Sequence, residues 1–179
     1  MLFTKEKHVA YIGIGSNQGD RMMNCIRALE MLSAHKQMEL IRVSRWFETE
    51  AMGERGPTGQ PPFLNAAARV DTTLLAGEFL RALLDIETKL GRPPDRPKGS
   101  PRSIDLDLLL YDDLALHLED MTIPHPELPK RLFVLVPLCD IAAEVAHPPS
   151  GLTIRELEVR CRSLGHPAWV NEWKPDDKK

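Results

Sequence analysis

The chain has 179 residues, a length that suits one domain and lets folding bury roughly 70% of the surface that the unfolded chain exposes. Apolar residues make up 42% of it and charged residues 27%, which excludes a disordered segment, a collagen-like fibre or a coiled coil as the main body. A formal net charge of −3 argues against nucleic-acid binding through bulk positive charge, so any anion site has to be local.

The first elements are an expected strand, helix and strand. Residues 9–15 form a short apolar run that ends in Gly-Ser-Asn, which predicts a buried strand followed by a tight turn. An amphipathic helix is predicted next, because apolar residues recur at intervals of three and four: Met22, Ile26, Leu29 and Leu32. Residues 39–49 are rich in β-branched and aromatic types, as a second strand would be, and a Gly- and Pro-rich loop follows over 51–62.

A strand is predicted over residues 63–72, and its two faces differ. Alternation sends four apolar side chains to a core face: Leu64, Ala66, Ala68 and Val70. Phe63 and Asn65 stand side by side on the opposite face together with Arg69. An aromatic ring and an amide that face away from the core favour contact with a ligand over packing.

The next elements are a helix and a strand that carries two carboxylates. A helix is predicted up to Gly91 from the apolar residues Phe79, Leu80, Leu83, Leu84, Ile86 and Leu90. In the strand over 103–111, alternation places Ile104, Leu106, Leu108 and Leu110 on one face. The other face then carries Asp105, Asp107, Leu109 and Tyr111.

The C-terminal part contains an apolar segment over 132–138 and a late helix. Thr153 and Glu156 form a capping-box pattern at the start of that helix. The element order is therefore strand, helix, strand, strand, helix, strand, followed by additions. This order predicts an α+β fold, a ferredoxin-like βαββαβ sheet with helices on one face and a C-terminal extension. We expect one domain over residues 1–179, with a core from about 9 to 165 and a charged, mobile tail over 169–179.

Cysteine use and the N-terminal sequence indicate the compartment. Cys25, Cys139 and Cys161 are widely spaced, and no C-x-x-C pair suggests a disulfide framework or a zinc site. The N-terminal segment lacks the apolar stretch of a signal peptide, and no run approaches the ~20 residues that span a bilayer. We therefore expect a cytoplasmic protein without membrane partners.

Asp105 and Asp107 are candidate metal ligands. Two residues apart on a strand, their attachment points are separated by about 6.6 Å, so their oxygens can converge. Two divalent ions roughly 3.5 to 4 Å apart would fit such a pair, and hard oxygen ligands suit Mg²⁺ when phosphates complete the coordination. The alternative is a solvated strand face, which is the usual meaning of an isolated D-x-D.

A basic segment precedes this pair. Residues 92–102 carry four basic side chains, Arg92, Arg96, Lys98 and Arg102, against one acid. Together with the carboxylates they could hold a metal-bound polyphosphate, although a solvated charged loop explains the charges equally well. His125 and Arg131 could add phosphate donors. The Gly13–Gly19 segment has the spacing G-x-G-x-x-x-G, which is not a nucleotide-binding loop and favours a strand-to-helix turn.

These motifs together resemble one enzyme family. The matching segments are residues 11–21 (YIGIGSNQGDR), 63–65 (FLN), 91–92 (GR), 101–109 (PRSIDLDLL), 124–126 (PHP) and 131–133 (RLF). On these motifs the chain resembles the 6-hydroxymethyl-7,8-dihydropterin pyrophosphokinases of folate biosynthesis. The resemblance covers about residues 9–160, and its P-R-x-x-D-L-D segment is highly specific.

The resemblance implies transfer of pyrophosphate from ATP to the pterin's hydroxymethyl oxygen, with AMP as the other product. It implies small-molecule substrates only, no nucleic acid, two Mg²⁺ ions and a monomer or weak homodimer. Asp105 and Asp107 would hold the metal ions and, with Arg92 and Arg102, carry catalysis. The positions that would face ATP are Arg92, Lys98, Arg102, Leu108, His125 and Arg131. The positions that would form the pterin pocket are Thr49, Met52, Phe63, Asn65 and Phe133.

Four positions differ from residues that are frequent in this family: Ala51, Leu84, Pro94 and Gly99. We expect activity to survive these differences with altered ATP affinity or loop dynamics. Two rival functions remain open on the residues alone. One is a two-metal phosphodiesterase or nuclease, which the net acidic charge disfavours. The other is a non-catalytic ferredoxin-like ligand-binding module with solvated carboxylates.

Overall fold

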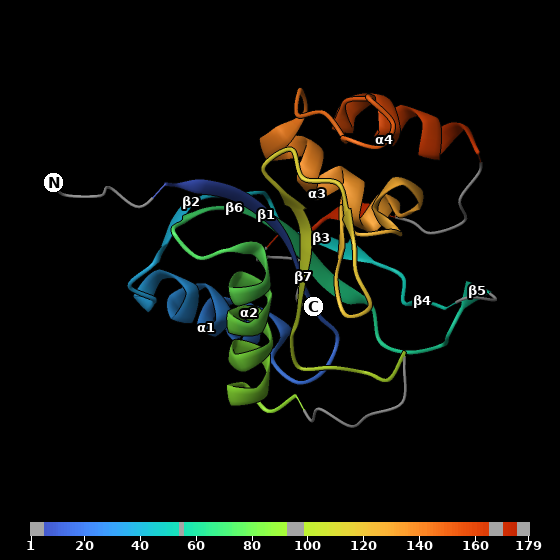
Figure 1. The fold of residues 1–179 in the computed structure, drawn as a ribbon. Coiled ribbons are helices and arrows are strands. Elements are labelled where there is room, and N and C mark those ends of the chain that lie inside the picture. Colours follow the sequence, from blue (N-terminus) through green and yellow to red (C-terminus); the bar gives the residue numbers. More distant parts are fainter. Residues whose placement is uncertain (1–5, 54–55, 93–98, 165–169, 175–179) are drawn as a thin grey trace, which may run out of the picture.

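An antiparallel sheet lies between two pairs of helices in the computed structural model, which describes residues 6–53, 56–92, 99–164 and 170–174 (Figure 1). The strand order is β10-β3-β6-β1-β7, with β2 also paired to β6. The strands of this sheet are β1 (His8–Ser16), β2 (Met38–Val43), β3 (Phe47–Thr49), β6 (Phe63–Thr72), β7 (Asp105–Tyr111) and β10 (Val170–Glu172). Each pairing among the described residues is antiparallel. Because helices and strands occur in one fold, the predicted mixed α and β architecture is confirmed.

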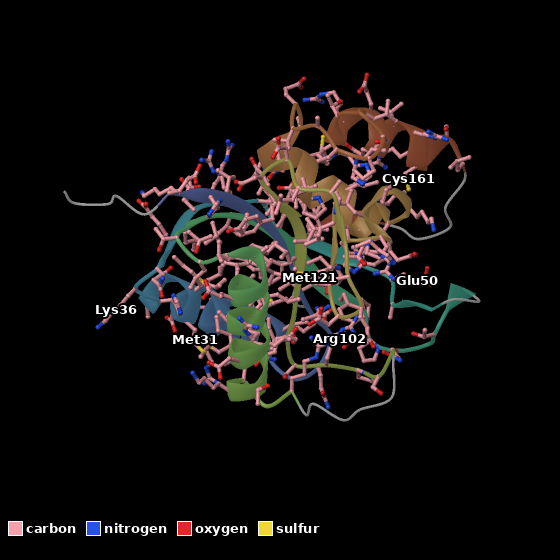
Figure 2. The ribbon with its side chains drawn as sticks, viewed as in Figure 1. Met31, Lys36, Glu50, Arg102, Met121 and Cys161 are labelled. Atoms are coloured by element: carbon pink, nitrogen blue, oxygen red, sulfur yellow. The ribbon has the colours of Figure 1, made fainter. Side chains whose placement is uncertain are left out.

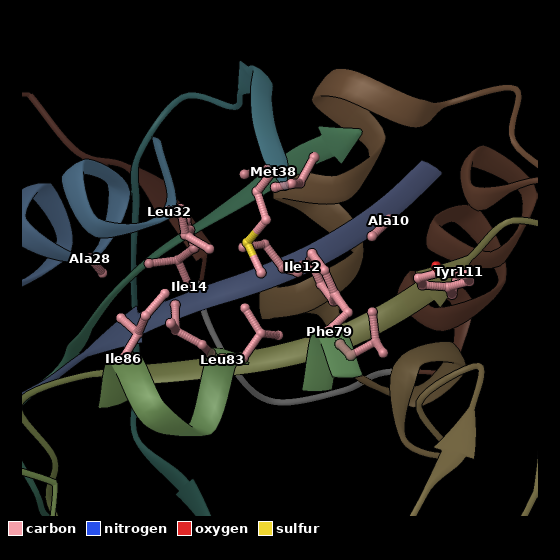
Figure 3. Packing of buried hydrophobic residues seen from close by; sticks show 14 of the residues in the cluster. Ala10, Ile12, Ile14, Ala28, Leu32, Met38, Phe79, Leu83, Ile86 and Tyr111 are labelled. Carbon is pink, nitrogen blue, oxygen red and sulfur yellow. The ribbon is translucent and has the colours of Figure 1, made fainter. Parts of the chain in front are cut away.

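The first core lies between the sheet and helices α1 (Arg21–Ala34) and α2 (Ala76–Lys89). In Figure 3, Ile12 and Ile14 of β1 lie in the same cluster as Leu32 of α1 and Leu83 of α2. The Asp20 carboxylate caps α1 by accepting a hydrogen bond from the Met23 amide, as expected for an acidic residue at a helix start.

The buried stripe of α1 differs from the predicted one. Cys25, Ala28 and Leu32 are buried, whereas Ile26 is 37% exposed. Both stripes have helical spacing, so periodicity alone does not separate them. Small side chains at 25 and 28 let the helix approach the sheet closely, and that close packing orients the helix.

The second face of the sheet is covered by the C-terminal helices α3 (Leu132–Ala142) and α4 (Ile154–Ser163). α3 packs on the sheet, and α4 packs on α3 (Figure 1). The prediction of helices on one face therefore holds for α1 and α2 only, because the extension supplies helices to the opposite face. Thr153 caps α4 in the predicted capping box with Glu156.

Strand β7 departs from simple alternation at its end. A register shift against β1 between Tyr11 and Ile12 inserts an extra residue, as a β-bulge does. Leu110 consequently packs in the α3 core, and Tyr111 packs in the α1/α2 core beside Phe79. The predicted faces of Leu110 and Tyr111 are therefore wrong, whereas the faces of residues 105 to 109 are as expected.

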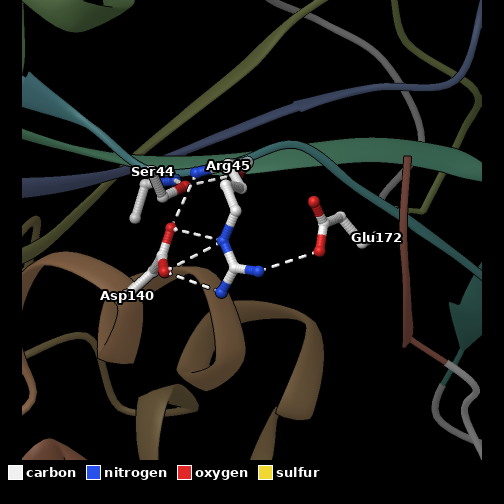
Figure 4. A network of polar contacts seen from close by, with 5 residues as sticks. Ser44, Arg45, Asp140 and Glu172 are labelled. Carbon is white, nitrogen blue, oxygen red and sulfur yellow. Dashed lines mark hydrogen bonds and ion pairs between the residues drawn. The ribbon is translucent and has the colours of Figure 1, made fainter. Parts of the chain in front are cut away.

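The expected strand over 39–49 is divided into β2 and β3, which pair with successive stretches of β6. Between them the Ser44 hydroxyl accepts a hydrogen bond from the Ala67 amide and donates one to the Arg45 carbonyl. The Arg45 guanidinium pairs with Asp140 of α3 and Glu172 of β10, each at 2.8 Å (Figure 4). This polar network joins the interstrand segment, α3 and the C-terminal strand.

The remaining elements are short. The loop over 51–62 contains β4 (Met52–Gly53) and β5 (Gly56–Pro57), and the segment after β7 contains β8 (Leu116–His117), β9 (Thr122–Ile123) and a 3₁₀ helix, Leu128–Lys130. Residues 170–172, expected to lie in the charged tail, instead form β10. In the described ranges no helix is both long and apolar enough to cross a bilayer.

Candidate active site

A hollow opens on the second face of the sheet, where the C-terminal helices end. On that face α3 covers Tyr11, Ala67 and Leu109. Two residues away on the same strands, Gly13, Asn65 and Asp107 line an open pocket with about 510 Å³ of space that no atom fills. The pocket is lined by Gly13, Ile14, Gly15, Thr49, Glu50, Phe63, Asn65, Ala66, Arg102, Asp105, Asp107, Phe133 and Val134. Four strands and one helix therefore contribute to a single recess.

Two glycines of β1, Gly13 and Gly15, line this pocket, and they differ in the space beside them. A Cβ at Gly15 would lie 2.9 Å from the Asn65 Oδ1 atom and 3.6 Å from the Phe63 ring. A Cβ at Gly13 would make only ordinary contacts, the nearest at 3.6 Å from Leu109. Gly15 is thus required for close approach of Asn65, whereas Gly13 is not.

One end of the pocket combines aromatic rings with a fixed amide. The Asn65 Nδ2 atom donates a hydrogen bond of 2.7 Å to the Thr49 hydroxyl, and both residues are buried. Phe63 and Phe133 line the same recess. An arginine lies over each ring: Arg102 is 5.2 Å from the Phe63 centroid, and Arg131 is 5.6 Å from that of Phe133. This end can accept a flat heterocycle whose polar edge meets Asn65.

The other end carries the two carboxylates on one strand face, as the alternation predicts. Asp105 pairs with Arg92 at 2.7 Å and with Arg102 at 3.0 Å. Burial, followed by the charge of Asp105, raises the pKa of Asp107 to about 7, although the nearby arginines act in the opposite direction. The surroundings of Asp107 therefore favour its neutral form more than those of an exposed carboxylate would.

Arg102 lies beside the start of β7, far from Cys161 in α4 (Figure 2). Its Nε atom is buried and, within the described part of the chain, has no hydrogen-bond partner. Two hydrogen bonds with Asn17 fix the backbone of Arg102. The Arg102 backbone amide donates to the Asn17 Oδ1 atom at 2.8 Å, and the Asn17 backbone amide donates to the Arg102 carbonyl at 3.1 Å. An unpaired guanidinium nitrogen beside the pocket suits an anionic ligand.

This geometry agrees with a comparison of sequences. The chain matches the sequence profile of the family described as 7,8-dihydro-6-hydroxymethylpterin-pyrophosphokinase (HPPK) over residues 11–143. The chain belongs to this family. It is therefore a pyrophosphokinase of folate biosynthesis, and its small-molecule substrates are ATP and 6-hydroxymethyl-7,8-dihydropterin.

Relatives with established names agree with this membership. A 2-amino-4-hydroxy-6-hydroxymethyldihydropteridine pyrophosphokinase from Synechocystis is 37% identical over 164 residues, covering 90% of this chain and 82% of the relative. The corresponding protein of Aquifex aeolicus is 38% identical, over 83% of this chain and 89% of the relative. The folic acid synthesis protein fol1 of Schizosaccharomyces pombe is 39% identical, but the chain spans only 21% of its length.

Solved structures share the fold. A Plasmodium falciparum HPPK-DHPS structure, wild type with SDX-DHP, superposes with a TM-score of 0.69 at 15% identity. The superposition covers 88% of this chain and 45% of that one. At this identity the likeness concerns the fold alone.

Several residues expected at the HPPK site lie near the pocket without lining it. Arg92 reaches Asp105, and Arg131 lies over the Phe133 ring. The His125 amide donates to the Leu109 carbonyl, which ties this segment to β7. Burial, followed by the charge of Arg131, lowers the pKa of the half-buried His125.

Three residues expected at the site are not found beside the pocket in the described part of the chain: Leu108, Met52 and Lys98. The Leu108 side chain packs in the α1/α2 core, because alternation turns it to the face opposite Asp107, so it does not reach the pocket. Met52 lies in β4, but its side chain is outside the described part of the chain, and Lys98 lies wholly outside the described residues.

Two functional candidates were not singled out from the sequence: Asn17 and Glu87. Asn17 is 2% exposed, and its Nδ2 atom also contacts the Gln60 side chain and the Pro61 carbonyl in the loop over 51–62. Glu87 is 2% exposed and contacts Arg92. A signal for Glu87 existed, since it stands four residues after Leu83 on the buried stripe, whereas Leu84 is 50% exposed.

Proposed function

We propose that this pocket is where pyrophosphate passes from ATP to the hydroxymethyl oxygen of the dihydropterin. Phe63, Asn65, Thr49, Met52 and Phe133 would hold the pterin. The ATP phosphates would lie at the carboxylate end, where Arg92, Lys98, Arg102, His125 and Arg131 supply donors. The observation that carries this proposal is that one recess joins an aromatic and amide end to a carboxylate and arginine end.

The donor set fits Mg²⁺ bound together with phosphate. Asp105 and Asp107 offer hard oxygen ligands from one strand face, and Mg²⁺ takes few protein carboxylates when phosphates complete its octahedron. Within the described residues no group of three or more His, Cys, Asp and Glu side chains is arranged to hold a metal. We propose that Asp105 and Asp107 hold two Mg²⁺ ions together with ATP. When bound, these ions would neutralise negative charge on the phosphates.

The side chains would act mainly by positioning and by charge. Phosphoryl transfer spreads negative charge over the transferred group, so arginine donors near that group lower the barrier. The buried Nε atom of Arg102, which has no hydrogen-bond partner among the described residues, suits this task, and Arg92 can exchange Asp105 for a phosphate oxygen. The Asn65 and Thr49 pair would fix the pterin edge and thereby orient the hydroxymethyl oxygen for in-line attack. No general base is required.

Two loops would exclude water from the reacting groups. The Gln60 Nε2 atom donates to the Gly99 carbonyl at 2.9 Å, so the loop over 51–62 contacts the basic segment directly. Asn17 joins the same loop to Arg102. Movement of these two segments as one cover over the phosphates would protect ATP from hydrolysis.

The test is incubation with ATP, Mg²⁺ and the dihydropterin, followed by quantification of AMP and pterin diphosphate. Asp107→Ala should abolish turnover and leave the folded state intact, because it removes a ligand that lines the pocket and does not belong to either hydrophobic core. Near-normal turnover of this variant would refute the metal assignment. Cleavage of a polynucleotide, or binding without AMP formation, would instead support the nuclease or binding-module alternatives.

Further proposals concern fold class, assembly and compartment. The strand order β7-β1-β6, followed by β2 and β3, and the βαββαβ element order support a ferredoxin-like classification. We also propose a single domain that acts as a monomer or weak homodimer in the cytoplasm. Sedimentation at several protein concentrations tests the assembly.

A further inference from the structure

Glu87 of α2 is a buried carboxylate that no substrate contact explains. It is 2% exposed, lies on the inner face of the helix with Leu83 and Ile86, and does not line the pocket. No other carboxylate in the described part of the chain is as completely buried. Because burying an ionised carboxylate is costly unless it is paired and hydrogen-bonded, its partners indicate its role.

The first partner is a backbone amide at the outer edge of the sheet. β7 is the last strand in the sheet order, so the backbone groups on its outer side have no neighbouring strand in the part of the chain that the structure describes. The Glu87 Oε1 atom accepts a hydrogen bond of 2.6 Å from the Leu106 amide on that side. Leu106 stands between Asp105 and Asp107, so this bond holds the middle residue of the carboxylate pair.

The second partner is the guanidinium of Arg92. Its Nη1 atom contacts the same Glu87 oxygen and also lies 2.7 Å from Asp105 Oδ1. Arg92 stands three residues after the end of α2, and its amide donates to the Glu87 carbonyl at 3.0 Å. Both ends of the Arg92 residue are therefore tied to Glu87, and its side chain is turned toward the carboxylate pair.

We propose that Glu87 is a positioning residue for the pyrophosphoryl transfer. Through the Leu106 amide it fixes the strand so that Asp105 and Asp107 face the pocket, and through its charge it holds Arg92 beside Asp105. This inference rests on the proposed roles of Asp105, Asp107 and Arg92 at the phosphate end. Glu87 acts through these residues and touches neither substrate.

The two contacts can be separated by substitution. Glu87→Gln keeps an oxygen acceptor for the Leu106 amide but removes the charge that holds Arg92. Glu87→Ala removes both contacts. Asp85→Asn is the matched control on the same helix, since Asp85 is exposed and pairs only with Lys89 in the described contacts. The measurements are kcat, the KM for ATP, the KM for the dihydropterin and the urea midpoint of unfolding.

Loss of Arg92 positioning should affect the phosphate end alone. We expect Glu87→Gln to lower kcat/KM for ATP about 10-fold while the pterin KM changes less than about 2-fold. Glu87→Ala should lose more, and Asp85→Asn should match the unsubstituted chain. A purely structural role would lower the urea midpoint and leave the ratio of ATP to pterin KM unchanged, which would overturn the proposal.

The Arg92→Met background gives a decisive second measurement. Removing the guanidinium leaves the Glu87 carboxylate buried without its counter-charge, so Glu87→Gln should now raise the urea midpoint and should not lower kcat further. An equal loss of kcat/KM in both backgrounds would contradict the proposal. If Asp107→Ala abolishes turnover but Glu87→Gln behaves as the unsubstituted chain, only the role of Glu87 fails. If Asp107→Ala retains turnover, the metal assignment itself fails.

Discussion

Gly15→Ala is the substitution that tests the pocket floor most directly. The new Cβ would lie 2.9 Å from Asn65 Oδ1, a separation that Cβ atoms essentially never show. Asn65 cannot simply move away, because its Nδ2 atom is bonded to Thr49 at 2.7 Å and both residues are buried. The substitution must therefore strain this pair or break its hydrogen bond.

The expected loss of stability follows from the cost of either outcome, strain of the Asn65 and Thr49 pair or loss of its hydrogen bond. Overpacking a fitted site costs about 1 to 3 kcal/mol, and leaving a buried polar group unsatisfied costs about the same. The lower chain entropy of alanine in the unfolded state offsets about 0.5 to 1 kcal/mol of this. We expect the free energy of unfolding to fall by about 0.5 to 2 kcal/mol. Displacement of Asn65 should weaken pterin binding by about 5- to 150-fold, corresponding to about 1 to 3 kcal/mol.

The assay is urea unfolding followed by tryptophan fluorescence, with calorimetric titration of the dihydropterin. Gly13→Ala is the control for folding, because its Cβ would meet only ordinary contacts and its stability should be unchanged or slightly raised. Equal stability and equal pterin affinity of the two alanine variants would refute the inference that Gly15 is needed for the position of Asn65.

Two further predictions concern the Phe63 ring in the pocket and the ion pair between Arg45 and Asp140. Phe63→Leu removes the ring beneath Arg102, and we expect pterin affinity to fall about 10-fold with little change in unfolding free energy, measured by the same titration. The Arg45 hydrogen bond lowers the pKa of Asp140 from its ordinary value of 3.8. The ion pair therefore contributes its full stabilisation when the pH is above 3.8. This contribution is lost as the pH falls through the depressed pKa of Asp140. Asp140→Asn should flatten the loss of stability between about pH 5 and pH 2; an unchanged slope would contradict this.

The features predicted correctly from sequence are those that local geometry decides. Alternation is enough to place Asp105 and Asp107 on one face, and Phe63 and Asn65 on the face of β6 that lines the pocket. The cap of α4 at Thr153 depends only on residues within one helical turn. The family motifs include these same residues, which is why the carboxylate and aromatic ends of the site were both expected.

The features that sequence did not indicate depend on contacts between distant segments. The exchange of faces between Leu110 and Tyr111 needs the bulge against β1, which is a property of the pair of strands. The burial of Glu87 becomes favourable only when the Leu106 amide and Arg92 are brought beside it. Leu108 was expected at ATP from the motif, but the alternation that turns Asp107 toward the pocket turns the Leu108 side chain into the α1/α2 core.

The pairing of β10 with β3 has a practical consequence for preparing this enzyme. Val170 of β10 lies opposite Thr49, whose hydroxyl holds Asn65 in place. An affinity tag or fusion partner attached after residue 174 would follow closely on β10, the strand that pairs with Thr49 beside the pocket. His8 begins β1 about 23 Å from Gly15, at the far end of that strand. An affinity tag ahead of His8 is therefore the better choice for kinetic work.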